Sequence, residues 1–249
     1  MRHTFAKYVF LPLFAVLALS AFCAETPTAE QLLQRARDPK SASTYGRFFG
    51  TLQHRRRGQE TLEMPLYFGV IIQPERTIGQ ILVNYRESYT ISQNRLAGRD
   101  GTSVIYDQAI CKTLDLVGLR ASDLTMSFLH YKLVKELDGA MLNAVVSCRV
   151  LLLESPDDNP GGKEYVRVFL EKESAFPLRA EFLKQPDDPK PFRMIEANGF
   201  TKKNDLYYAR TITVQGPGWR TKVEFEPSQA TLGMFDKNNP VNVFLPVIK

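Results

Sequence analysis

Few residues of this chain have types and spacings suited to chemistry. Beyond the first segment there are two histidines, His54 and His130, and neither has metal-ligand spacing to a cysteine. The sequence contains no G-x-S-x-G nucleophile elbow, no H-E-x-x-H zinc motif, no phosphate-binding loop and no G-x-G-x-x-G motif. We therefore expect no catalytic residue, no metal site, no cofactor and no enzymatic activity.

Paired carboxylates are the remaining catalytic candidates. Asp157-Asp158 and Asp187-Asp188 both lie in proline-rich stretches, where aspartate favours the turn itself. Glycoside hydrolysis would need two carboxylates facing each other across a cleft, which these pairs do not predict. A hydrolase with an unrecognised site stays open as an alternative that turnover of ester substrates would reveal.

Two cysteines, Cys111 and Cys148, follow the first segment. An oxidising compartment outside the cytoplasm would permit a disulfide between them. Cys148 also lies in an apolar run, where a small buried thiol fits equally well. Both alternatives stay open.

The most regular part of the chain is Tyr165 to Leu232, which predicts an antiparallel meander. Short apolar segments alternate there with turns rich in Pro, Gly, Asn and Asp. The expected strands are Tyr165–Leu170, Pro177–Leu183, Phe192–Phe200, Leu206–Val214 and Trp219–Glu226.

The last of these strands has one apolar and one polar face. Trp219, Val223 and Phe225 share a parity with Thr221, and charged residues occupy the other parity. A sheet with one apolar face must cover that face with another element.

Two short helices are expected to supply the cover. Thr28 and Gln31 form a capping box for a helix that ends near Arg37. Ser122 or Asp123 can cap a second helix over Leu124–Leu129. Further strands are expected at Tyr45–His54, Thr61–Gln73, Ile78–Arg86, Ser88–Asn94, Ser103–Asp107, in a hairpin around Asp138-Gly139, and at Val241–Ile248.

These elements predict a mainly β protein. We expect a curved antiparallel sheet, or incomplete β-barrel, with short helices covering its concave face. No repeat or long linker divides the 249 residues, so we expect a single domain over 25–249.

The segment Met1–Ala24 has the features of a secretory signal peptide. A basic start precedes an apolar run of about fourteen residues, which is short for a membrane span. Cleavage is favoured. Lipid attachment at Cys23 and an uncleaved anchor are the less favoured alternatives.

The charge of the chain does not indicate a nucleic-acid partner. The net charge is +5, and losing Arg2 and Lys7 with the leader leaves about +3. The run Arg55–Arg57 could form a patch for anionic lipid or nucleic acid, but a solvated hairpin tip is the favoured interpretation.

The segment Tyr165–Phe182, with its F-P-L-R-A-E-F end, resembles the LolA-like outer-membrane lipoprotein-sorting proteins of Gram-negative bacteria. Ser122–Leu129 resembles their short helix before the same meander. The resemblance implies an incomplete barrel with a helical lid, a periplasmic location and a hydrophobic cavity for the acyl chains of lipoproteins or lipids. It also implies a release complex in the inner membrane or an acceptor at the outer membrane as partners.

We expect a lipid-binding carrier that acts as a monomer, without catalysis. An envelope sensor or protein-interaction module on the same fold is the alternative. The candidate cavity residues are Phe182, Tyr208, Ile212, Val223 and Phe225, with Met126 and Phe128 as lid candidates. Plain core packing is the favoured interpretation of all seven, and lipid contact is the alternative.

Overall fold

The structure is a computed structural model of the chain. It describes residues 26–37, 43–94, 101–157, 159, 162–236 and 238–247. The expected leader Met1–Ala24, with Cys23, lies outside the described residues.

Strands dominate the described chain, and the helices are short. The strands are β1 (Thr44–Arg56), β2 (Leu62–Ile72), β3 (Arg76–Val83), β4 (Glu87–Asn94), β5 (Gly101–Tyr106), β6 (Lys132–Leu142), β7 (Val146–Glu154), β8 (Tyr165–Glu171), β9 (Pro177–Leu183), β10 (Arg193–Lys203), β11 (Leu206–Gly216), β12 (Trp219–Phe225) and β13 (Thr231–Met234). The helices are α1 (Ala29–Arg37), α2 (Thr113–Leu116), α3 (Ala121–Leu124) and the 3₁₀ helix η1 (Ser127–His130).

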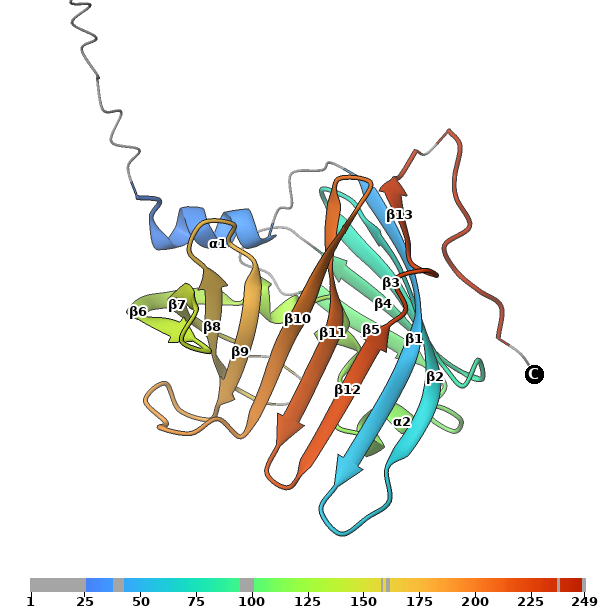
Figure 1. Ribbon diagram of the computed structural model, residues 1–249, viewed down its shortest axis with the longest axis horizontal. Helices are drawn as coiled ribbons and strands as arrows, with labels where there is room; N and C mark the ends of the chain where they lie inside the picture. The colour runs from blue at the N-terminus through green and yellow to red at the C-terminus, as the bar shows by residue number, and fades with distance from the viewer. Residues whose placement is uncertain are drawn as a thin grey trace, which may run out of the picture.

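All the strands belong to one open antiparallel sheet (Figure 1). Its order is β5-β4-β3-β2-β1-β12-β11-β10-β9-β8-β7-β6, and β13 pairs with the start of β1. The two halves of the chain meet where β1 pairs with β12. The prediction of a curved antiparallel sheet with few helices is confirmed.

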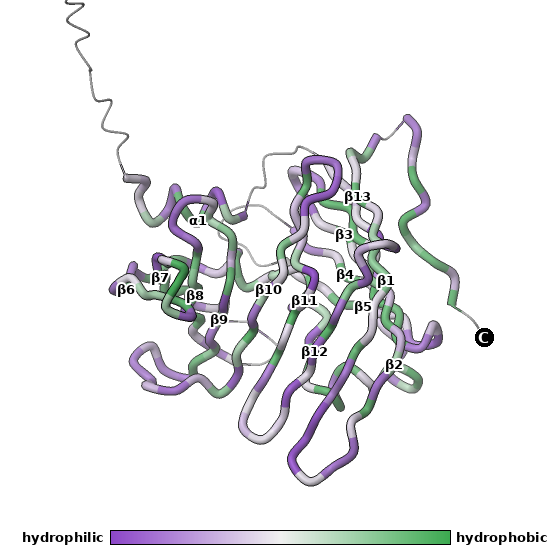
Figure 2. Tube along the Cα trace, viewed as in Figure 1, coloured by the Kyte–Doolittle hydropathy of each residue, from purple (hydrophilic) through white to green (hydrophobic). Residues whose placement is uncertain are grey.

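The five predicted strands of the meander are confirmed as β8 to β12. In β12, Thr221, Val223 and Phe225 are buried, whereas Arg220 on the other parity, and Glu226 just after the strand, are exposed. We call the face that carries Val223 and Phe225 the inner face, because these residues share a hydrophobic cluster with the helices. Figure 2 shows that hydrophobic stretches follow the strands, whereas the tip of the β1–β2 hairpin is hydrophilic.

The capping box at the start of α1 is also confirmed. The amide of Gln31 donates to Oγ1 of Thr28 at 3.2 Å, and the amide of Thr28 donates to Oε1 of Gln31 at 2.8 Å. Leu32 and Leu33 are fully buried against the inner face.

Residues 107–131 connect β5 to β6 and carry α2, α3 and η1; we call them the cover segment. The expected single helix over Leu124–Leu129 is wrong, because the chain forms α3 and η1 with Met126 between them. Met126 has φ 52° and ψ 43°, a left-handed conformation that a right-handed helix cannot contain.

The predicted hairpin is confirmed as β6 and β7, but the position of its turn, predicted at Asp138-Gly139, is wrong. The strand β6 runs through both residues, and its pairing with β7 shifts register between Leu137 and Ala140. The turn lies instead at Asn143 and Ala144, which have φ 51° and 57°.

The strand predicted at Val241–Ile248 is also wrong, because its described part, 241–247, forms no strand. This tail packs on the outer face of β2 and β3. The Tyr67 hydroxyl donates to the Val243 carbonyl, and the Gln80 side chain exchanges two hydrogen bonds with the backbone of Leu245, at 3.0 and 2.8 Å.

Candidate lipid-binding face and its cover

The five cavity candidates lie together on the inner face, on β9, β11 and β12. Ile212 and Val223 are direct partners across β11 and β12. All five side chains belong to one hydrophobic cluster, with exposures of 0% for Val223 to 8% for Tyr208. In this structure the face is therefore covered, and its apolar residues form core packing.

An aromatic group forms the centre of this face. The Phe48 ring lies 5.3 Å from the Phe225 ring and 5.2 Å from the Tyr208 ring, and Phe68 lies 6.4 Å from Phe225. Phe48 and Phe68 were not among the predicted site residues. They come from the first half of the chain, and the β1–β12 pairing brings them here.

The lid candidates do lie over the sheet candidates. The Phe128 ring packs edge-on against the Phe182 ring at 5.7 Å, and Met126 is half-buried against the same cluster. Phe128 is itself buried, so the cover segment contributes side chains to the core.

Two ion pairs hold α3 against the sheet, one of them buried and one with a partly exposed arginine. Arg193 of β10 pairs with Asp123, and both side chains are nearly inaccessible. Arg120 makes two hydrogen bonds to Glu164 at 2.8 and 3.2 Å, and Glu164 also accepts from the Tyr131 hydroxyl at 3.2 Å. Burial alone would lower the pKa of Arg120, but the bonds to Glu164 outweigh it and raise that pKa above its ordinary value.

The guanidinium groups of both ion pairs stack on one of the cavity candidates. Arg193 lies 4.9 Å and Arg120 lies 5.5 Å from the centre of the Phe182 ring. Sequence reasoning missed these charged residues, because each resembles an ordinary surface charge. A pairing between residues 70 positions apart, as for Asp123 and Arg193, has no local signal.

A second fastening joins α2 to β12. The Thr221 hydroxyl donates to the Val117 carbonyl, and Nδ1 of His54 lies 2.8 Å from the same hydroxyl oxygen. Since Thr221 has one proton to give, His54 donates from Nδ1. Burial lowers the pKa of His54, and the nearby charge of Arg56 lowers it further.

A third fastening holds the start of α2. Glu87 of β4 accepts hydrogen bonds from the Thr113 hydroxyl at 2.5 Å, the Tyr89 hydroxyl at 2.7 Å, and the amides of Lys112 and Thr113. Burial would raise the pKa of Glu87, but these bonds outweigh it and lower the pKa below its ordinary value of 4.5. These polar contacts thus hold the cover segment to the sheet at three places.

Of the two alternatives for the cysteines, the structure has separate thiols. Cys111 and Cys148 are both free and buried, and they belong to different hydrophobic clusters. No disulfide joins them, because Cys111 precedes α2 whereas Cys148 lies in β7 near the far edge of the sheet. Burial raises the pKa of each thiol.

Asp188, one of the paired aspartates, has a structural role. Asp188 caps its own turn by accepting from the amides of Lys184 and Gln185, at 3.0 and 2.8 Å. Within the described ranges, no group of three or more His, Cys, Asp or Glu side chains could hold a metal ion. No helix in this part of the chain is long and apolar enough to cross a membrane.

Comparison with known proteins gives structural relatives only. No family model matches the chain, and no curated protein matches it. A Vibrio parahaemolyticus domain assigned to outer membrane lipoprotein sorting aligns with a TM-score of 0.57 and 15% identity, over 85% of this chain and 96% of its own.

Two further solved structures align over similar lengths. A DUF1329 family protein from Desulfovibrio piger has a TM-score of 0.55 and 12% identity, over 82% of this chain and 90% of its own. A LolA superfamily protein from Nitrosomonas europaea has a TM-score of 0.52 and 10% identity, over 84% and 94%. At these identities the similarity concerns the fold: the chain has a LolA-like fold.

Proposed function

We propose that the protein is a periplasmic, non-catalytic carrier that holds acyl chains of lipoproteins or lipids against its inner face. The observation that carries the proposal is the way this face is covered. A continuous apolar surface, centred on Phe48 and Phe225, is closed by one connecting segment and α1 rather than by a second sheet. The LolA-like fold supports the same function, with delivery towards the outer membrane.

Binding in this proposal exchanges one apolar cover for another. The cover segment moves off the inner face, and an acyl chain replaces its side chains against the sheet. Each buried methylene contributes about 0.8 kcal/mol, so a long acyl chain can offset the loss of the three polar fastenings. The proposed carrier is the monomeric domain over 25–249, exported by the leader, and its partners are an inner-membrane release complex or an outer-membrane acceptor.

The fastening at Thr221 offers a direct test. We expect a fluorescent fatty acid to bind the purified protein saturably. Thr221→Val should bind it more tightly, because removing the bond to Val117 lowers the free energy needed to open the cover. Thr211→Val, on the same sheet but away from the cover, is the control. No saturable binding by any of the three proteins would reject the proposal.

One observation favours a second function, a sensor or protein-interaction module. The five cavity candidates are at most 8% exposed, as in a finished core. This alternative predicts that the protein binds a partner protein while its inner face stays closed. It also predicts that the fatty acid fails to bind both the wild type and Thr221→Val.

A further inference from the structure

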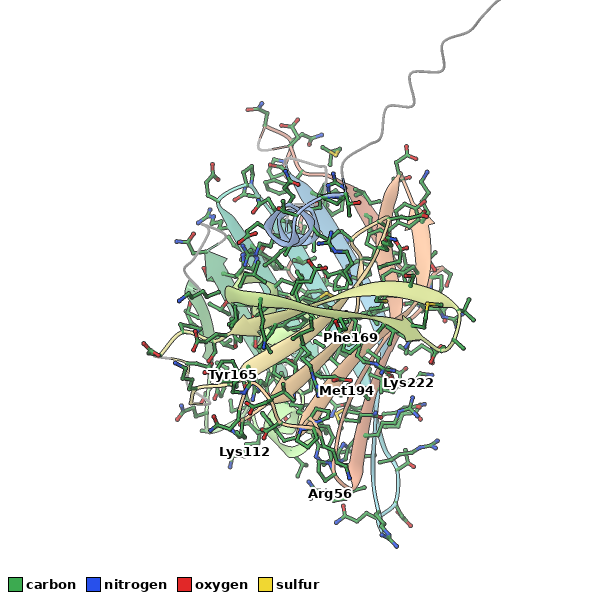
Figure 3. The ribbon with its side chains drawn as sticks, turned by 90° about the vertical axis from the view of Figure 1, so that its left-hand side faces the viewer. Arg56, Lys112, Tyr165, Phe169, Met194 and Lys222 are labelled. Atoms are coloured by element: carbon green, nitrogen blue, oxygen red, sulfur yellow. The ribbon has the colours of Figure 1, made fainter. Side chains whose placement is uncertain are left out.

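Arginines line a shallow hollow at one end of the sheet, where Trp219 separates it from the face described above. The hollow is largely open to solvent, and it lies where the tip of the β1–β2 hairpin meets the tip of the β11–β12 hairpin. Figure 3 labels Arg56 at this end of the molecule. We call it the arginine pocket; it is lined by Arg55, Arg56, Arg57, Gln59, Thr61, Gly216, Gly218, Trp219 and Arg220.

The two hairpins hold the arginines in fixed register. Arg55 is the direct partner of Arg220 across β1 and β12, and Arg56 is the partner of Trp219. Beyond the strands, the amide of Arg57 donates to the Gly218 carbonyl at 3.0 Å. The four cations therefore belong to a paired backbone rather than to an isolated loop.

The charges of the arginine pocket are not balanced by the protein. Its lining includes four arginines and no carboxylate. Within the described part of the chain, none of the four forms an ion pair, although Arg179, Arg193 and Arg210 of the same sheet do. Like charges placed directly opposite on neighbouring strands, as Arg55 and Arg220 are, destabilise a sheet. An anion bound between them would remove this repulsion.

We propose that the arginine pocket is a binding site for a phosphate group, carried by a lipid headgroup or free in solution. Guanidinium groups donate pairs of parallel hydrogen bonds, a geometry that matches phosphate oxygens. Gln59 and Thr61 add neutral polar side chains to the same hollow. The exposure of Arg55, Arg56 and Arg57 agrees with the solvated hairpin tip expected from the sequence, and the proposal adds a ligand for this tip.

Trp219 links the arginine pocket to the cover segment. Its ring lines the pocket and lies so close to Gly118 that a Cβ on that glycine would meet it at 2.7 Å. A headgroup bound in the arginine pocket would therefore lie next to Trp219, at the end of the sheet near α2. This last step rests on the proposed carrier function, whereas phosphate binding itself does not.

The experiment uses Trp219, the single tryptophan of the chain, as a local fluorescent reporter. The purified protein is titrated with pyrophosphate, with phosphatidylglycerol vesicles and with phosphatidylcholine vesicles at constant ionic strength. We expect a saturable fluorescence change with pyrophosphate or with the anionic vesicles. A response to pyrophosphate identifies free phosphate as sufficient, and a response to the anionic vesicles alone identifies the lipid headgroup as the source.

The variant Arg55→Gln/Arg220→Gln should weaken this binding at least about tenfold, since each lost phosphate contact is charge-assisted. It should fold at least as stably as the wild type, because the substitution removes a repulsion. The control Arg86→Gln/Lys190→Gln removes the same charge from exposed positions elsewhere and should bind normally. The proposal would be overturned if neither pyrophosphate nor the phosphatidylglycerol vesicles changed the fluorescence. It would also be overturned if the two double variants lost binding affinity equally.

The fatty acid titration separates this inference from the carrier function. Phosphate binding without fatty acid binding would reject the carrier function and support the phosphate site. If the protein binds the fatty acid but responds neither to pyrophosphate nor to phosphatidylglycerol vesicles, the phosphate site is rejected and the carrier function is supported.

Discussion

Phe225 packs between Phe48 and Phe68 on the inner face and is 3% exposed. A carboxylate at this position would lose its hydration without gaining a partner. We expect Phe225→Asp to lower the free energy of unfolding by several kcal/mol, measured by urea denaturation. Tyr207→Asp, at a position that is 52% exposed, is the matched control and should have little effect. An unchanged urea midpoint for Phe225→Asp would mean that the face is open to water.

Glu87 makes the attachment of α2 dependent on pH. Its pKa in the folded protein lies below the ordinary value of 4.5, so the folded state favours the ionised form. The resulting stability is present above pH 4.5 and is lost as the pH falls through the lowered pKa. Glu87→Gln should therefore be less stable than the wild type at neutral pH, and the gap should shrink in acid.

Urea denaturation at several pH values measures this gap. Glu60→Gln, at an exposed position in the β1–β2 loop, is the control for removing a carboxylate elsewhere. A difference between wild type and Glu87→Gln that stays the same from neutral to acid pH would contradict the assignment.

At the scale of elements, the ion pair between Asp123 and Arg193 joins α3 to β10. Replacing one partner leaves the other charge buried, so we expect Arg193→Met or Asp123→Leu to lower the stability by about 3–5 kcal/mol each. The double variant should lose far less than the sum, because it leaves no unpaired charge. The stability that the double variant still loses should reflect the missing hydrogen bond from the Arg120 amide to Asp123.

Urea denaturation of the four proteins gives the coupling energy of the pair. The same cycle on Lys202 and Asp205, which are paired but largely exposed, should give at most about 1 kcal/mol. If the double variant lost as much stability as the two single variants together, the ion pair between Asp123 and Arg193 would not hold the cover segment to the sheet.

The elements that the sequence predicts well are those with a local signal. Alternation of apolar and polar residues located β8 to β12, and the capping box at Thr28 located α1. Asp138-Gly139 is also typical of a turn, but both residues lie inside β6, where the pairing with β7 shifts register. The C-terminal tail is apolar enough for a strand, yet it docks on the outer face through Tyr67 and Gln80.

The candidate site was predictable only in its apolar part. Residues such as Val223 and Phe225 follow from strand parity alone. Phe48 and the charged residues of the cover reach the site through pairings distant in sequence, so no local pattern could connect them. The seven predicted cavity and lid residues are brought together, and their part in lipid binding stays a prediction.

Two surfaces of the whole molecule suit the two ends of an amphiphile. The inner face, under the cover segment, suits a hydrocarbon chain, and the arginine pocket at the hairpin tips suits a phosphate group. Trp219 lies between them, in contact with both. Such a division would let one amphiphile engage its tail and its headgroup on the same molecule.

The most direct test is native mass spectrometry of the protein purified from the cell envelope without detergent. We expect a fraction of the molecules to be heavier than the polypeptide by the mass of an acylated compound, which is released on denaturation. The mass of the polypeptide alone, in protein that also takes up no added fatty acid, would contradict the claim that the inner face opens to accept an acyl chain.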